Sequence, residues 1–363
     1  MFMGRSCATR PATLNFPGFK SAPKSFVELL IRPFLLFFKT LSSFRVTSQK
    51  VREKFCCKPF PPDFLRTYAS GKCILKGAKD QMDTTTPQAL VFTGYGLNCD
   101  YETDFSLKLA GAESHRVHIN QLITTRRAGE RASLEDYHIL VLGGGFSWGD
   151  DHGAGVLMAA KLSHHLGGEI ERFIQDGKLV LGICNGFQTL VNLGLLPAFG
   201  LQYGERHLAL TCNDSGNFVD TWVNLKVNQG SPCVFTRGIA SLELPVRHGE
   251  GKFYAEAAEL KRLFEEEHVV LQYADENGDE AHGQRPLNPN GSLGDIAGIC
   301  DPSGRIFGLM PHPEAFNHYT NHPDWTRKRE AFLRKHKEIT SEEGAGIKIF
   351  RNAVDYVKTS LLA

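Results

Sequence analysis

Short apolar runs alternate with amphipathic stretches through residues 88–200, and each apolar run ends in small residues. Short unbroken apolar runs are typical of buried strands, whereas apolar residues three and four apart indicate helices. The pattern predicts strands within 89–94, 115–120, 134–146 and 179–181, with helices over 100–112 and 154–175. In the first of these helices, Phe105, Leu109 and Ala112 fall on one face.

Strands that alternate with helices predict a parallel, doubly wound sheet. Between 205 and 275 the segments become short, β-rich and interrupted by glycine and proline, which predicts an antiparallel extension or insertion. The later elements are predicted as a helix over 255–267, strands over 268–275, 296–301 and from 305 through Pro311, and a closing helix over 349–363. The predicted fold class is therefore α/β, with a doubly wound, mostly parallel sheet and a β-rich antiparallel extension.

The junction after the 179–181 strand is the first candidate for chemistry. The strand runs through Gly182-Ile183-Cys184-Asn185-Gly186 into an amphipathic helix. Two small residues flanking a nucleophile between strand and helix form the nucleophile-elbow pattern. The start of the following helix favours both a thiolate and a developing oxyanion. Taken alone, Cys184 fits a buried structural cysteine equally well.

A histidine and a carboxylate near the end of the chain supply what a cysteine nucleophile needs. His312 and Glu314 lie two residues apart between prolines, just after the last predicted strand. Residues two apart in extended backbone project to the same side. We expect His312 to act as base for Cys184, Glu314 to orient it, and the N–H of Asn185 and one from Gly143–Gly145 to stabilise an oxyanion.

With these motifs the chain resembles the class I (triad) glutamine amidotransferases. It is also similar, over about residues 88–316, to the glutaminase subunits of phosphoribosylformylglycinamidine synthase. The matching segments are GYGLNCDYET (94–103), GGGFSWGDD (143–151), GICNGFQTLVNLGLLP (182–197), NDSGNFVDTWV (213–223), SPCVFTRGI (231–239), RHGEGKFYA (247–255), NPNGS (288–292) and GLMPHPEAF (308–316). Glutaminases in general do not need NDSGNF, RHGEGKF or NPNGS, so these three make the resemblance specific.

The resemblance implies a flavodoxin-like amidotransferase domain over 88–363 that hydrolyses glutamine. Its ammonia would pass to a synthetase partner that converts formylglycinamide ribonucleotide to formylglycinamidine ribonucleotide in purine biosynthesis, with a small bridging subunit as a further possible partner. No cofactor, metal, nucleic acid or membrane contact is expected for this chain, and ATP and Mg²⁺ are expected on the synthetase partner. No phosphate-binding G-x-x-x-x-G-K-[ST] segment is present.

The resemblance also assigns roles to residues. Cys184 becomes the nucleophile, His312 the general base and Glu314 its orienter. The residues expected to hold glutamine or its oxyanion are Gly144, Gly145, Phe146, Asn185 and Gln188. The chain departs from the family at Trp148, where tyrosine or phenylalanine is common, and at Gly143, where proline is common.

Composition separates the first 82 residues from the rest. They hold 15 basic and 4 acidic residues, against 26 and 36 in the remainder. Residues 1–87 are thus predicted to be a basic extension: an organellar targeting segment, a disordered or partner-binding arm, or, as we favour, a gene-model artefact with translation starting at Met82. The nine cysteines have no disulfide-framework spacing, which indicates a reducing compartment, and we expect the cytoplasm.

Three other functions compete with this interpretation. They are a class I amidotransferase with another acceptor, a non-catalytic scaffold with the same fold, and an α/β-hydrolase with a cysteine nucleophile. Among single residues, His248 either shapes the glutamine site or contacts a partner, or is a polar turn residue. Residues 150–152 are expected to be a loop and helix N-cap rather than metal ligands, and Cys99 lies on the active rim without an elbow.

Overall fold

A nine-stranded sheet organises the part of the chain that the computed structural model describes, residues 85–123, 132–335 and 342–363. Its strand order is β2-β1-β3-β4-β11-β10-β9-β6-β7, and β5 pairs with β8 in a separate two-stranded sheet. The strands are β1 (Gln88–Thr93), β2 (Glu113–His118), β3 (Ile139–Leu142), β4 (Leu179–Ile183), β5 (Leu208–Cys212), β6 (Val219–Val227), β7 (Ser241–His248), β8 (Glu250–Ala255), β9 (Val269–Ala274), β10 (Ile296–Cys300) and β11 (Ile306–Leu309).

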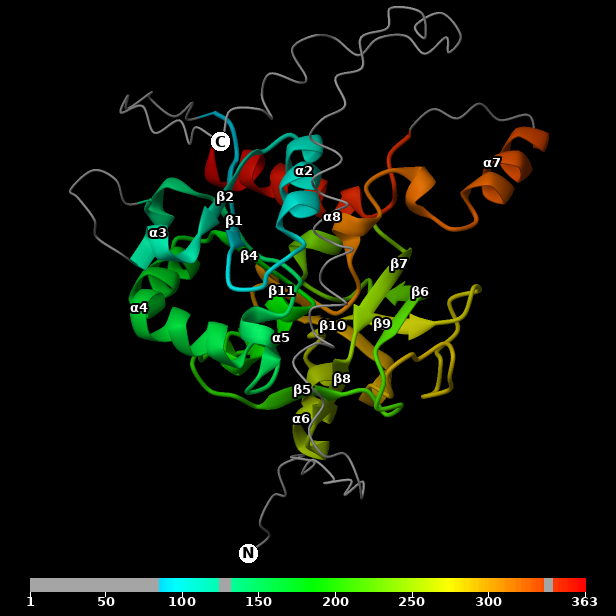
Figure 1. Ribbon diagram of the computed structural model, residues 1–363, viewed down its shortest axis with the longest axis horizontal. Coiled ribbons are helices and arrows are strands. Elements are labelled where there is room, and N and C mark those ends of the chain that lie inside the picture. The colour runs from blue at the N-terminus through cyan, green and yellow to red at the C-terminus, as the bar shows by residue number, and fades with distance from the viewer. Residues whose placement is uncertain (1–84, 124–131, 336–341) are drawn as a thin grey trace, which may run out of the picture. The chain divides into compact units, whose positions relative to one another are not determined.

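Five neighbouring strands, β2-β1-β3-β4-β11, are parallel, which confirms the predicted doubly wound core. Every residue of β3, β4 and β11 is buried, as expected for strands covered on both faces. Helices α2 and α8 pack against each other on one side, and α4 packs against α5 on the other (Figure 1). The helices are α2 (Asp100–Ala110), α3 (Ile119–Ile123), α4 (Val156–Gln175), α5 (Asn185–Asn192), α6 (Ala257–Glu265), α7 (Trp325–Arg334) and α8 (Ile347–Tyr356).

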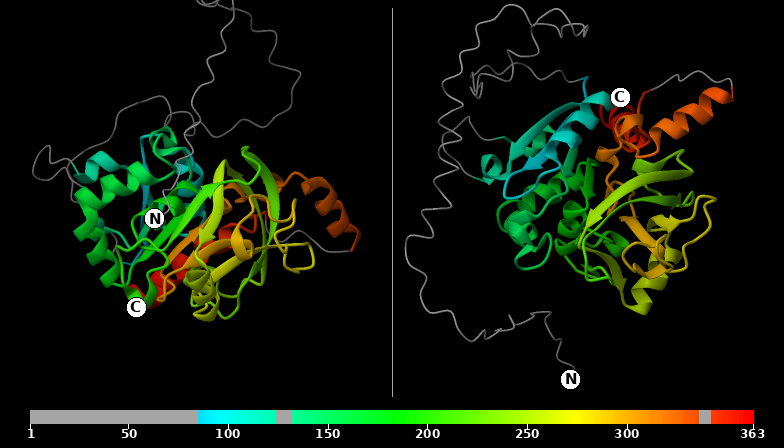
Figure 2. Two further views of the ribbon diagram at one scale, coloured as in Figure 1. Left: turned by 90° about the horizontal axis from the view of Figure 1, so that it is seen from below. Right: turned by 45° about the vertical axis from the view of Figure 1, so that its right-hand side comes forward.

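The remaining strands of the main sheet extend it in antiparallel fashion. β10 pairs antiparallel with both β11 and β9, and β6 joins β9 to the edge strand β7. The second view in Figure 2 shows this extension standing beside the helix-covered part. The predicted β-rich extension is therefore confirmed, and the β5–β8 ladder is an additional element that the sequence pattern did not separate from it.

The buried face of α2 differs from the pattern on which the helix was predicted. Phe105 and Leu109 do share a face, but their side chains are 55% and 36% exposed. The helix is buried instead through Thr103, Leu107 and Ala110. Apart from Leu107 and Asp100, the buried side chains of α2 are small or hydroxylated, which allows the helix to lie close to β2 and α8, while Phe105 and Leu109 are left on the outer side.

Parallel pairing brings the carboxyl ends of β1, β3, β4 and β11 to one edge of the sheet. Loops 94–99 and 143–155, the β4–α5 junction and residues 310–314 follow these ends directly. This is the edge at which ligands bind in open α/β sheets. The fold therefore places the predicted glycines, Cys184 and His312 in one neighbourhood.

The described residues form one compact unit. The interpretations offered for residues 1–82 lie outside the described residues. Within the described ranges, no helix has the length and apolar character needed to cross a bilayer.

Candidate active site

Cys184 lies in a strained turn between β4 and α5. Its φ of 51° and ψ of −105° are unusual for a residue with a side chain. A Cβ on Gly186 would lie 1.9 Å from the carbonyl oxygen of Leu142 in β3, so only glycine fits there. The turn is held by a hydrogen bond from the Cys184 N–H to the Leu309 carbonyl, 2.8 Å long. These features are those of the nucleophile elbow that the sequence predicts.

His312 and Glu314 form a buried pair beyond the end of β11. The imidazole Nδ1 lies 2.6 Å from the Glu314 carboxylate, and both side chains are at most 3% exposed. The backbone N–H of His312 donates to the Pro245 carbonyl at 2.8 Å, which ties this loop to β7. With Nδ1 bound to Glu314, the buried Nε2 has no hydrogen-bond partner and is left for chemistry.

The charges around His312 favour its protonated form. Burial by itself lowers the pKa of the imidazole, but the Glu314 carboxylate and the Cys184 thiolate together hold the pKa well above its ordinary value. The surroundings of His312 therefore favour an imidazolium, the charge that stabilises a nearby cysteine nucleophile.

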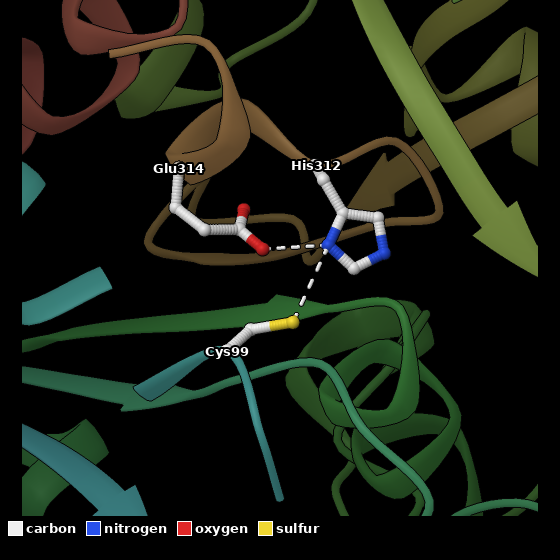
Figure 3. Close-up of side chains that lie close together, drawn as sticks. All are labelled: Cys99, His312 and Glu314. Carbon is white, nitrogen blue, oxygen red and sulfur yellow. Dashed lines mark hydrogen bonds and ion pairs between the residues drawn. The ribbon is translucent and has the colours of Figure 1, made fainter. Parts of the chain in front are cut away.

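Cys99 is a second thiol at the same histidine. Its Sγ lies 3.9 Å from His312 Nδ1, the nitrogen that already contacts Glu314, and Figure 3 shows the other ring nitrogen facing away from both groups. Burial raises the pKa of the Cys99 thiol. Cys99 precedes α2 and is not in an elbow conformation. Its geometry therefore fits a nucleophile less well than that of Cys184.

The ligand atoms of Cys99, His312 and Glu314 lie within 4.8 Å of one another, a spacing that would admit a metal ion. The 2.6 Å contact between His312 Nδ1 and Glu314 occupies the space between two of these ligands. A metal ion would have to break the contact that orients the histidine. The cluster is therefore better described as a hydrogen-bonded site than as a metal centre.

The glycine loop after β3 reaches the side chain of His312. A Cβ on Gly144 would lie 2.7 Å from the His312 ring and 3.1 Å from the Cys99 sulfur. Hydrogen bonds between the Phe146 N–H and the Gly96 carbonyl, and between the Asn98 N–H and the Gly144 carbonyl, fix this loop against the one after β1. The Phe146 side chain is 45% exposed. Gly144 thus lies where a backbone group can approach a substrate bound at His312.

Asn185 and Gln188 are buried on α5, and their side chains contact other parts of the site. The Asn185 amide donates to Asp150 at 3.1 Å, and the Gln188 amide donates to the Glu250 carbonyl of β8 at 2.6 Å. Burial and the nearby Glu250 charge raise the pKa of Asp150 to about 6, although the Asn185 hydrogen bond lowers it. These two hydrogen bonds connect α5, the helix that follows Cys184, to the loop that contains Asp150 and to β8.

Residues 150–152 do lie in the predicted loop before α4, but the predicted N-cap within them was wrong. Asp150 closes a short 3-10 turn with φ of 55°, and the residue that caps α4 is Gly155. Asp150 instead accepts the hydrogen bond from Asn185. Its role depends on a contact with a residue 35 positions away, which a local pattern does not encode.

The three motifs that made the resemblance specific form one hydrogen-bonded cluster. Asn213 contacts His248 at 3.1 Å, and the Asp214 N–H donates to the Asn290 carbonyl at 3.1 Å. The Asn290 amide donates to the Gly251 carbonyl at 2.9 Å. His248 is 3% exposed and is therefore not a surface turn residue. The motifs themselves were the sequence signal for this cluster, but their mutual contacts were not predicted.

The fold and this constellation define a class of protein, the glutamine amidotransferases with a Cys-His-Glu site. The model of the CobB/CobQ-like glutamine amidotransferase domain matches residues 86–357. The phosphoribosylformylglycinamidine synthase subunit PurQ of Methanococcus maripaludis is 45% identical over 275 residues, which cover 76% of this chain and 99% of the relative. PurQ of Archaeoglobus fulgidus is 38% identical and is likewise covered over 99% of its length.

A solved structure agrees with these sequence relatives. A chain of the PurLQS structure from Thermotoga maritima is 30% identical and superposes with a TM-score of 0.52, covering 75% of this chain and all of that chain. The protein described here belongs to the PurQ family of phosphoribosylformylglycinamidine synthase subunits.

Proposed function

We propose that this chain is the glutaminase subunit of a phosphoribosylformylglycinamidine synthase. It hydrolyses glutamine and delivers ammonia to a synthetase partner that converts formylglycinamide ribonucleotide to formylglycinamidine ribonucleotide. The observation that carries the proposal is the strained Cys184 elbow beside the buried His312–Glu314 pair, in a chain 45% identical to a PurQ subunit.

In the first half of the reaction, the Cys184 thiolate attacks the side-chain amide carbon of glutamine. His312, protonated and held by Glu314, gives its proton to the departing nitrogen. Ammonia leaves and a glutamyl thioester remains on Cys184. Glu314 keeps the imidazole in the orientation that directs Nε2 toward the reaction, because its carboxylate holds Nδ1 at 2.6 Å.

In the second half, water attacks the thioester while His312 acts as base, which releases glutamate and regenerates the thiolate. Both steps pass through a tetrahedral oxyanion. The proposed donors are the Asn185 N–H at the start of α5 and a backbone N–H of the Gly144–Gly145 segment. Each well-aligned donor of this kind lowers a barrier by about 3 kcal/mol. Phe146 and Gln188 are proposed to contact the bound glutamine.

The partner and the compartment follow from the same proposal. Ammonia would be lost to solvent unless a synthetase subunit received it at the site, and the name PurLQS describes such an assembly for the Thermotoga maritima relative. ATP and Mg²⁺ are proposed to bind that partner rather than this chain. The cytoplasm is the proposed location.

The test compares two cysteine variants in complex with the synthetase subunit. Cys184→Ala should abolish glutamine-dependent amidation and labelling by a glutamine-mimicking electrophile, while synthesis from added ammonia persists. Cys99→Ala is the matched control, because it removes the other thiol near His312 and should retain the labelled Cys184. If Cys184→Ala kept glutamine-dependent activity while Cys99→Ala lost it, the nucleophile would be Cys99 instead.

A further inference from the structure

His248 is a buried histidine beside the reactive pair that the reaction steps above do not use. It ends β7 and is 3% exposed. A Cβ on Gly251 would lie 2.4 Å from its ring, so the glycine of the neighbouring strand is what makes room for the imidazole. The interior therefore accommodates the His248 side chain only because position 251 is a glycine.

The hydrogen bonds of Asn213 determine which ring nitrogen of His248 carries the proton. The Asn213 amide nitrogen donates to the Asn217 carbonyl at 2.9 Å and to the His248 carbonyl at 2.8 Å. Its amide oxygen therefore faces His248 Nδ1, at 3.1 Å. Because an amide oxygen can only accept, Nδ1 must carry the hydrogen.

The other ring nitrogen, Nε2, is then a bare acceptor. It is buried and has no hydrogen-bond partner within the described residues. A buried acceptor without a partner lowers stability, and such a group in a native protein requires an explanation. A small molecule that donates a hydrogen bond from an N–H or O–H group would satisfy this acceptor.

The position of His248 indicates which small molecule would bind to Nε2. The carbonyl of the preceding residue, Arg247, lies 3.8 Å from the Cys184 sulfur, and the same strand binds the His312 backbone through Pro245. Burial, together with the charge of His312, lowers the pKa of His248 to about 3. The imidazole is therefore neutral near pH 7, and in this tautomer it cannot donate a proton from Nε2.

We propose that His248 Nε2 accepts a hydrogen bond from the ammonia released at Cys184 and retains it, unprotonated, for transfer to the synthetase partner. The inference rests on the proposed glutaminase function and deepens it. No bond forms or breaks at His248. Ammonia uses one N–H as donor, so its lone pair stays free for attack on the activated acceptor. A protonated histidine at this position would convert ammonia to the unreactive ammonium ion.

The experiment measures product formed per glutamate released, in the complex with the synthetase subunit. His248→Leu removes the acceptor and should lower this ratio about fivefold, which is the change expected for one ordinary hydrogen bond. Glutamate release, Cys184 labelling and ammonia-dependent synthesis should remain. His248→Gln, which restores an acceptor oxygen, should recover part of the ratio. His164→Leu, on the exposed side of α4, is the matched control.

Two outcomes would overturn the proposal. An unchanged ratio in His248→Leu would mean that Nε2 binds only water. A proportional fall of glutamate and product would mean that the ring merely shapes the glutamine site, and thermal melting would show whether that variant still folds. A failure of the proposed glutaminase function would give a different result, because the Cys184→Ala variant would then still use glutamine.

Discussion

The Glu314 carboxylate favours the charged form of His312, the proposed general base, so Glu314→Gln should change the pH dependence of the site. The carboxylate raises the pKa of His312 against the effect of burial. A neutral amide removes that support, and the imidazolium should be lost at a lower pH than in the native chain. We expect glutaminase kcat to fall about 100-fold or more. The rate of Cys184 alkylation as a function of pH is the measurement, and an unchanged profile would contradict the role of Glu314.

Asp150 should make the native chain less stable as pH rises from about 4 to about 6. Its pKa is raised from an ordinary 3.8 to about 6, first by burial and then by the Glu250 charge. The folded state then binds more protons than the unfolded state in this interval, so the free energy of unfolding decreases with pH and levels off above it.

Asp150→Asn removes this titration and still offers an oxygen to the Asn185 amide. The difference in urea-unfolding free energy between the variant and the native chain should therefore grow in favour of the variant between pH 4 and 6. Asp151→Asn, at an exposed neighbour, serves as control. A constant difference across this range would show that Asp150 is not protonated in the folded state.

At the scale of elements, the contact between the elbow helix and β3 leaves no room for a side chain at Gly186. A Cβ there would meet the Leu142 carbonyl oxygen at 1.9 Å. Gly186→Ala should lower the free energy of unfolding by about 2 kcal/mol or more, because α5 must move away from the sheet. Cys184 labelling should slow as well, since the elbow moves with the helix.

Gly167→Ala is the matched control for this substitution. Gly167 lies inside α4, and a Cβ there would meet no heavy atom within 4 Å. The same chemical change should therefore stabilise the chain by about 0.5–1 kcal/mol, because alanine restricts the unfolded backbone more than glycine does. Urea unfolding monitored by circular dichroism measures both variants, and equal effects would refute the close-packing argument.

The elements themselves were largely predictable, because unbroken apolar runs and the Cys184 junction are local signals. The buried side of α2 was not, since Phe105 and Leu109 suggested an apolar core face and lie outside. Which face of a helix is buried depends on the surface it meets, and α2 meets the sheet and α8 through Leu107 and several smaller side chains.

The candidate site shows the same division between local and long-range information. Cys184, His312 and Glu314 were recognisable because each lies in a distinctive short motif at a predicted strand end. The contacts of Asp150 with Asn185, and of Asn213 with His248, join residues 35 positions apart in both cases. Such pairings are set by the packing of whole strands and helices, so a single sequence did not reveal them.

At the scale of the whole molecule, the family match falls mostly on residues that the structure describes. The match covers residues 86–357, and about three quarters of this chain spans 99% of the Methanococcus maripaludis relative. The residues that the family model matches begin at residue 86, after the basic segment.

A chain that begins at Met82 should therefore react like the full chain. We expect its rate of Cys184 labelling, and its glutamine-dependent synthesis with the synthetase subunit, to agree with those of the full chain. The physical reason is that β1, the first strand of the sheet, begins at Gln88 and pairs with β2 and β3 through residues that are all present. Labelling kinetics and coupled assays on both forms are the measurement. Equal labelling with reduced coupled synthesis would instead assign the basic segment to partner binding, whereas slower labelling would place it in the support of the active site.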